Sequence, residues 1–166
     1  VLSGKLEHKD SMGNGSVIEE GDLQYISAGG GVQHSEFNPS DSEKTELYQI
    51  WMRPNQKGGT PRYAEKKLSA ENSVNKTRLL FSEHGRDDSI EIRQNAEILF
   101  GHYQERKKYL VAKNELLKNL WIQVIEGQIN ISGNYLGKAD GLGIENQTNE
   151  LTLSITEESK FLIFRL

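Results

Sequence analysis

The chain has 166 residues, enough for one substantial domain or two small ones, and its 20 basic and 24 acidic residues give a net charge of −4. This mildly acidic balance, without a long run of either sign, argues against nucleic acid as a direct partner. The absence of cysteine excludes disulfides, thiolate metal sites and cysteine nucleophiles. The lack of cysteine is compatible with a reducing cytoplasm, where we expect the protein, and since no apolar run approaches the ~20 residues that a membrane span requires, we expect no membrane contact.

Alternation of polar and apolar residues, the period of a β-strand, begins at the first residue. In residues 1–10, "VLSGKLEHKD", the even positions share one face, and Lys5, Glu7 and Lys9 share an opposite, charged face. A turn rich in glycine and asparagine follows. Further strand-like segments are predicted at 22–28, 32–38 and 46–52.

The segment 53–76 is polar, holds two of the three prolines and has no sustained apolar period, so it is predicted to be a linker. Beyond it, short aliphatic segments separated by turns are typical of an all-β sandwich or barrel. The sequence therefore predicts an N-terminal β domain at 1–52, a linker at 53–76 and a C-terminal β domain at 77–166.

A short internal repeat relates the two halves, because "VLSGKL" at 1–6 aligns with "VIEGQI" at 124–129. The second copy follows a long strand-like stretch, whereas nothing precedes the first. If both halves are versions of one barrel, the first lacks its opening strands and has an uncovered sheet edge. We therefore expect the chain to be a fragment, an alternative start or an incomplete record of a longer protein.

Three motifs carry a family resemblance: "HKDSMGNG" at 8–15, "SAGGGVQHSEFNPS" at 27–40 and "LYQIWM" at 47–52. With the looser "WIQVIEGQINISG" and "DGLGI", they make nearly the whole chain resemble the pirin family, specifically its bacterial pirin-like bicupins. The general cupin signature also fits in part, since three residues separate His34 from Asn38. Two departures are visible: His34 lies two residues further from Gly21 than the signature asks, and Glu20 replaces a usual proline.

The resemblance implies an all-β bicupin whose first barrel, at 1–52, holds a metal, typically iron, through three histidines and a glutamate. His34 matches the third histidine and Glu36 the glutamate. The first two histidines belong to a His-x-His motif upstream of the segment matched here by "LSG", so half of the ligand set is absent from this sequence. The second barrel, at 77–166, has no His-x-His pair and is expected to bind no metal.

The pair in "GGGVQHSEFN" is also consistent with a metal site on its own terms. Residues two apart on a strand project from one face, so His34 and Glu36 can both point into a barrel. Imidazole nitrogen and carboxylate oxygen suit non-haem Fe(II). The alternative is a hydrogen-bonded strand histidine beside a solvated glutamate. Spacing alone favours that alternative, and the resemblance reverses the preference.

Other polar residues could complete or line the site. His8 and Asp10 share a strand face and could add two ligands. The preferred alternative is a buried, hydrogen-bonded His8 with Asp10 capping the turn, because the family does not use this histidine as a ligand. Gln49 and Trp51 share a face of segment 46–52 and could line the pocket with His8. Equally, Trp51 could fill core and Gln49 could face solvent.

Two classes of function remain open. The resemblance implies that the protein, when intact, is an iron-dependent oxygenase of the quercetin 2,3-dioxygenase type that acts on a small aromatic flavonol such as quercetin, with Glu36 accepting the substrate's hydroxyl proton. The alternative is a metal-binding redox-sensing or protein-interaction module without catalytic activity, whose partner is another protein. In either class, two protein ligands are too few to hold iron firmly, so we expect weak or absent binding in this chain.

Overall fold

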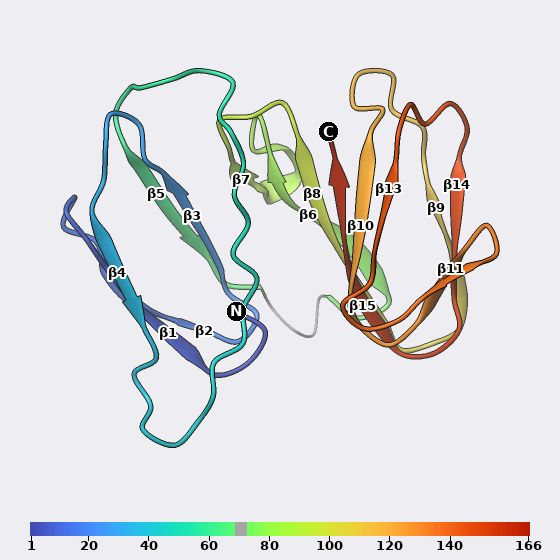
Figure 1. Ribbon diagram of the computed structural model, residues 1–166, viewed down its shortest axis with the longest axis horizontal. Helices are drawn as coiled ribbons and strands as arrows, with labels where there is room; N and C mark the ends of the chain where they lie inside the picture. Colours follow the sequence, from blue (N-terminus) through green and yellow to red (C-terminus); the bar gives the residue numbers. More distant parts are fainter. Residues whose placement is uncertain (69–72) are drawn as a thin grey trace. The chain divides into compact units, whose positions relative to one another are not determined.

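The computed structural model describes residues 1–68 and 73–166 and divides the chain into two compact units. The first comprises Val1–Ala70 with Ile92–Gln94, and the second Glu71–Glu91 with Asn95–Leu166. Apart from one short 3-10 helix, the regular structure of the described residues consists of β-strands (Figure 1). The all-β fold class is therefore confirmed. Within the described residues, no helix is long and apolar enough to cross a bilayer.

The strands of the first unit are β1 (Lys5–Asp10), β2 (Gly15–Glu19), β3 (Leu23–Ser27), β4 (His34–Phe37) and β5 (Arg62–Lys66). The elements of the second unit are β6 (Lys76–Ser82), the 3-10 helix η1 (Arg86–Asp88), β7 (Ile90–Glu91), β8 (Glu97–Tyr103), β9 (Lys107–Val111), β10 (Leu120–Glu126), β11 (Ile129–Ile131), β12 (Asn134–Leu136), β13 (Gly141–Ile144), β14 (Leu151–Ile155) and β15 (Ser159–Arg165).

In the first unit, β1 is the central strand of an antiparallel sheet with the order β2-β1-β4, and β3 pairs with β5. The alternation predicted for residues 1–10 holds in β1: Leu6 and His8 are buried, whereas Lys5 and Lys9 are exposed. The register places His8 opposite Glu36 and Asp10 opposite His34. The sheet thus brings the polar residues of β1 and β4 onto one face.

Strand β5 lies inside the range 53–76 that the sequence predicted to be a linker. It pairs antiparallel with β3, for example through Tyr25 opposite Ala64. Because β5 is mostly polar, it lacks the apolar alternation by which strands are recognised, and its backbone pairing with β3 forms the strand instead. Residues 69–72 of the predicted linker lie outside the described residues.

Segment 46–52 shows the opposite difference, because it was predicted as a strand and forms none. A single bridge joins Ser3 to Glu46, and none of the described strands pairs with the residues that follow. A strand depends on a partner for its backbone hydrogen bonds, so β-propensity alone does not create one. The side chains of this segment are largely exposed, with Trp51 at 87%.

The second unit consists of a six-stranded sheet, β13-β10-β15-β8-β6-β7, and a four-stranded sheet, β12-β11-β14-β9. Figure 1 shows the two sheets facing each other, and one hydrophobic core draws residues from both. Ile122, Phe161 and Ile163 come from the first sheet and Ile129 and Leu153 from the second, all with 0% exposure. Each such side chain contributes about 1.5–3 kcal/mol through burial.

Two glycines show that the internal repeat has a physical basis. Gly4 and Gly127 occupy equivalent positions of the repeat and have φ angles of +72° and +76°. A Cβ atom would lie 2.4 Å from the carbonyl oxygen of Lys44 at Gly4, and 2.0 Å from that of Glu158 at Gly127. Both positions therefore require glycine for the same two reasons, a left-handed backbone and a close approach of another segment.

Candidate metal centre

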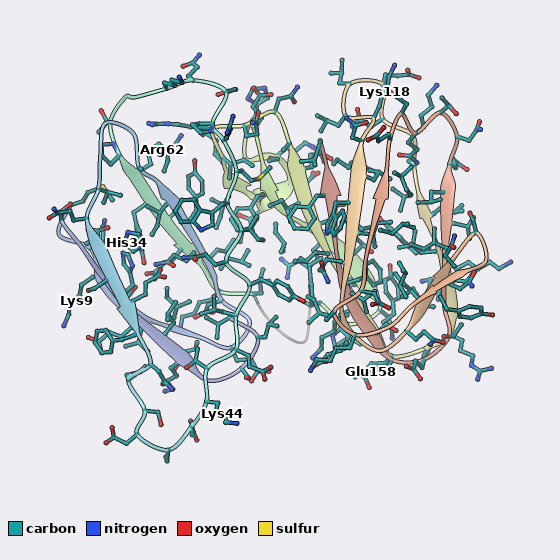
Figure 2. All side chains as sticks on the ribbon, in the orientation of Figure 1. Lys9, His34, Lys44, Arg62, Lys118 and Glu158 are labelled. Atoms are coloured by element: carbon teal, nitrogen blue, oxygen red, sulfur yellow. The ribbon has the colours of Figure 1, made fainter. Side chains whose placement is uncertain are left out.

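Strand β4 presents His34 and Glu36 on the face that His8 of β1 shares. The His34 ring centroid lies 5.8 Å from that of His8, and Glu36 Oε1 lies 3.7 Å from His8 Nδ1. In Figure 2, Lys9 extends away from the strands, whereas His34 lies on the side of β4 that faces β3 and β5. His34 is exposed in this structure and the Glu36 side chain is 19% exposed, so a ligand can approach both.

His8 is the buried centre of this polar group. Its side chain is 0% exposed, and its Nε2 lies 3.4 Å from Asp10 Oδ2. The Tyr63 ring of β5 stacks on it, with the centroids 4.9 Å apart and the planes inclined by 17°. These contacts confirm the buried, hydrogen-bonded histidine that the sequence favoured. Within the described residues, however, His8 Nδ1 has no hydrogen-bond partner.

Asp10 caps the turn between β1 and β2, as predicted. Its Oδ1 accepts hydrogen bonds from the backbone N–H groups of Met12 (2.9 Å) and Asn14 (3.0 Å), and its Oδ2 accepts one from Asn14 Nδ2 (2.7 Å). Burial raises the pKa of the Asp10 carboxyl, but the hydrogen bonds from Asn14, His8 and Met12 outweigh it and lower the pKa to about 2. Asp10 is thus an ionised acceptor already occupied by its own turn.

Tyr63 is the residue of this site that sequence reasoning missed, because it lies in the predicted linker. Its hydroxyl contacts Ser16 Oγ at 3.1 Å, accepts a hydrogen bond from Gln24 Nε2 at 3.3 Å and donates one to Glu65. Burial raises the pKa of Tyr63, and the hydrogen bond to Glu65 adds to this effect. The only signal in the sequence was an aromatic residue within a polar segment. The network fixes the ring that stacks on His8.

Gln49 and Trp51 follow Glu46 in the segment without a strand, and both side chains are exposed. Exposure of Trp51 excludes it from the core of this structure. The role of Gln49 and Trp51 in lining a pocket stays a prediction, as does the assignment of His34 and Glu36 as metal ligands.

The donor set fits a divalent metal in kind but not in number. One imidazole nitrogen and one carboxylate oxygen, from His34 and Glu36, suit divalent transition metals. Catalytic sites of this type generally use three protein ligands. Among the residues that the structure describes, no group of three or more histidine, aspartate or glutamate side chains could hold a metal ion. As predicted ligands, His34 and Glu36 would therefore form only part of such a ligand set.

The second unit, two facing β-sheets around one core, has the architecture of the cupin class. Residues 1–52 match the family model described as Pirin, and residues 79–166 match the one described as Quercetinase C-terminal cupin domain. A protein of Escherichia coli K12 named quercetin 2,3-dioxygenase is 36% identical over 166 residues, which are 100% of this chain and 70% of that relative. The chain belongs to the pirin family.

Solved structures support the same assignment. The bacterial pirin YhhW of Escherichia coli, in a crystal structure with nickel(II), is 34% identical, with a TM-score of 0.92 over 100% of this chain and 69% of that chain. A quercetin 2,3-dioxygenase from Acinetobacter baumannii has a TM-score of 0.76 at 16% identity, over 98% of this chain and 56% of that chain, and supports the fold alone.

Proposed function

We propose that the protein is a pirin-like cupin metalloprotein that acts as an iron-dependent dioxygenase on flavonols such as quercetin. The observation that carries the proposal is the pair of His34 and Glu36 on one face of β4, next to the buried His8. The name of the Escherichia coli relative, 36% identical over the whole chain, supports a flavonol as the substrate class.

In this proposal, His34 and Glu36 contribute ligands to one divalent metal. The nickel(II) complex of the related pirin supports a divalent ion, and we infer Fe(II) because imidazole and carboxylate ligands with open positions suit non-haem iron. When bound, the metal would polarise the substrate's oxygens and supply the redox chemistry that dioxygen requires. Glu36 would accept the proton of the substrate hydroxyl as a general base.

The second candidate is a metal-binding redox-sensing or protein-interaction module without catalytic activity. One observation supports it: among the described residues, no group of three or more histidine, aspartate or glutamate side chains could hold a metal ion, whereas a catalytic site generally uses three ligands. Both candidate functions require the same metal, so a measurement of metal binding does not distinguish the enzyme from the non-catalytic module. Turnover does.

The deciding experiment supplies the purified chain with excess Fe(II), quercetin and air, and follows oxygen uptake together with the mass of the cleaved product. Excess iron is needed because two ligands hold it weakly. We expect slow turnover above that of iron alone, and its loss in Glu36→Gln. Iron binding without any product above the protein-free control would reject the dioxygenase and support the second candidate.

A further inference from the structure

We propose that His8 is a positioning residue for Glu36, in that its buried ring holds the Glu36 carboxylate in the orientation needed to bind the metal. The metal part of this inference rests on the proposed function. The contact between His8 and Glu36 is a property of the metal-free chain, and it can be tested separately.

His8 has a buried ring nitrogen, Nδ1, without a hydrogen-bond partner in the described residues. The side chain is 0% exposed, so water does not satisfy Nδ1, and no hydrogen bond to it is formed within the described residues. The oxygen that faces it is Glu36 Oε1, at 3.7 Å, from the residue directly opposite in the antiparallel register. A buried polar atom without a partner costs free energy, so a small movement of Glu36 towards Nδ1 is favoured.

The His8 ring is held in place by its neighbours, whereas the Glu36 carboxylate is free to adjust. Tyr63 stacks on one face of His8, and Ser16 and Gln24 hold the Tyr63 hydroxyl. The Glu36 side chain is 19% exposed, in contrast with the fully buried His8. His8 therefore sets the position, and Glu36 follows it.

The contact between His8 and Glu36 depends on which ring nitrogen of His8 carries hydrogen. A neutral imidazole has one N–H, and both ring nitrogens of His8 face a carboxylate. Asp10 accepts three hydrogen bonds from Met12 and Asn14 besides its contact with His8 Nε2, whereas Glu36 Oε1 is the carboxylate oxygen that faces Nδ1. In the described part of the chain, the ion-pair contact of Glu36 is with His8. Hydrogen on Nδ1 lets His8 donate to Glu36, and a ring that carries hydrogen on both nitrogens donates to Asp10 and Glu36 together.

A histidine placed in this way affects the metal without touching it. Carboxylates that bind metals are themselves held by hydrogen bonds, and removal of such a partner typically costs about 10–100-fold in metal affinity. His8 would act by restricting the Glu36 carboxylate to the rotamer that leaves its second oxygen free for the metal.

The metal-free test uses nuclear magnetic resonance of the chain labelled with nitrogen-15 in histidine. In the wild type and in Glu36→Ala, the Nδ1 and Nε2 resonances of His8 are assigned. We expect Glu36→Ala to shift Nδ1 while Nε2, which faces Asp10, changes little. An unchanged Nδ1 resonance would overturn the inference. Since Glu36 is partly exposed, the variant is expected to fold, and thermal unfolding checks this.

The metal test compares two substitutions that each keep one nitrogen position of the ring. His8→Asn places an amide nitrogen near Nδ1, and His8→Gln places one near Nε2. By isothermal titration with nickel(II), His8→Gln should lose about tenfold or more in affinity, whereas His8→Asn should stay closer to the wild type. Equal losses in both variants would indicate a packing role alone and would contradict the proposal.

A matched control is available in the second unit, where His102 Nε2 lies 3.2 Å from Glu158 Oε1. His102→Gln removes a histidine–glutamate contact without changing the first unit, and nickel affinity should stay unchanged. If the wild-type chain binds no nickel(II) at all, the metal site of the proposed function fails. The resonance experiment still decides whether His8 holds Glu36.

Discussion

His8 of β1 and Glu36 of β4 lie directly opposite each other, and His8 Nδ1 is 3.7 Å from Glu36 Oε1. This pairing places the fully buried His8 side chain next to the partly exposed Glu36 carboxylate. The face of β4 that carries Glu36 also carries His34. A metal bound at this face would therefore have protein side chains on one side only.

We expect the 166-residue chain to bind Fe(II) or nickel(II) weakly, because the two ligands proposed for it, His34 and Glu36, are fewer than the usual three. Elemental analysis after gel filtration should find well under one equivalent. His34→Ala should abolish the remaining binding, and Ser35→Ala, on the other face of β4, should leave it unchanged. A full equivalent of tightly held metal would contradict this prediction and would make His8 and Asp10 the substitute ligands.

The pKa of Asp10 makes the stability of the first unit dependent on pH. Since folding lowers this pKa from 3.8 to about 2, the ionised carboxylate stabilises the folded state above pH 3.8, and that stabilisation is lost as the pH falls through about 2. Asn14→Ala removes the hydrogen bond from Nδ2, so the pKa should move back towards 3.8 and the urea midpoint at pH 7 should fall.

A carboxyl titration of Asp10 by nuclear magnetic resonance measures this change. Asn134→Ala is the matched control, because Asn134 also holds a turn through its side-chain amide, but in the second unit. An Asp10 pKa that stays near 2 in Asn14→Ala would show that the backbone hydrogen bonds and the hydrogen bond from His8 are enough to lower it.

Gly101 of β8 should not tolerate a larger residue. It pairs with Phe161 of β15, and a Cβ atom at Gly101 would lie 2.4 Å from Cζ of that ring. Gly101→Ala should lower the free energy of unfolding by about 1–3 kcal/mol through overpacking, measured by urea denaturation. Adding Phe161→Leu should recover part of the loss. Gly137→Ala is the control, since the nearest atom to its Cβ would be Asp140 Oδ2 at 3.8 Å.

Glu97 should contribute strongly to the stability of the second unit, because its side chain is only 11% exposed and forms ion pairs with two arginines. Its Oε1 lies 2.6 Å from Arg86 Nη2, and its Oε2 lies 3.2 Å from Arg165 Nη1. Removing one partner of a buried ion pair costs about 3–5 kcal/mol, and the half-exposed Arg86 reduces this, so Glu97→Gln should cost about 3 kcal/mol.

The exposed pair of Glu126 and Lys160, 2.8 Å apart, is the comparison for Glu97. Glu126→Gln should change the free energy of unfolding by less than about 1 kcal/mol. Equal effects of the two substitutions in urea denaturation would show that the buried network adds nothing to a surface pair.

The class of fold, the paired residues of β4 and the turn cap of Asp10 could be predicted from the sequence. Strand alternation places Leu6 and His8 on the buried face because side chains on a strand point alternately to its two sides. The carboxylate of Asp10 caps its own turn over a distance of four residues. Such local patterns depend on neighbours along the chain, so they can be read without coordinates.

The contacts that give the site its geometry were decided by the tertiary structure. Tyr63 reaches His8 because β5 pairs with β3, and that pairing depends on backbone hydrogen bonds rather than on an apolar pattern. Segment 46–52 has the composition of a strand but pairs with none of the described strands. Backbone pairing between distant segments leaves little trace in either sequence, which is why the sequence placed His34 and Glu36 on one face of a strand and only the fold showed which residues surround them.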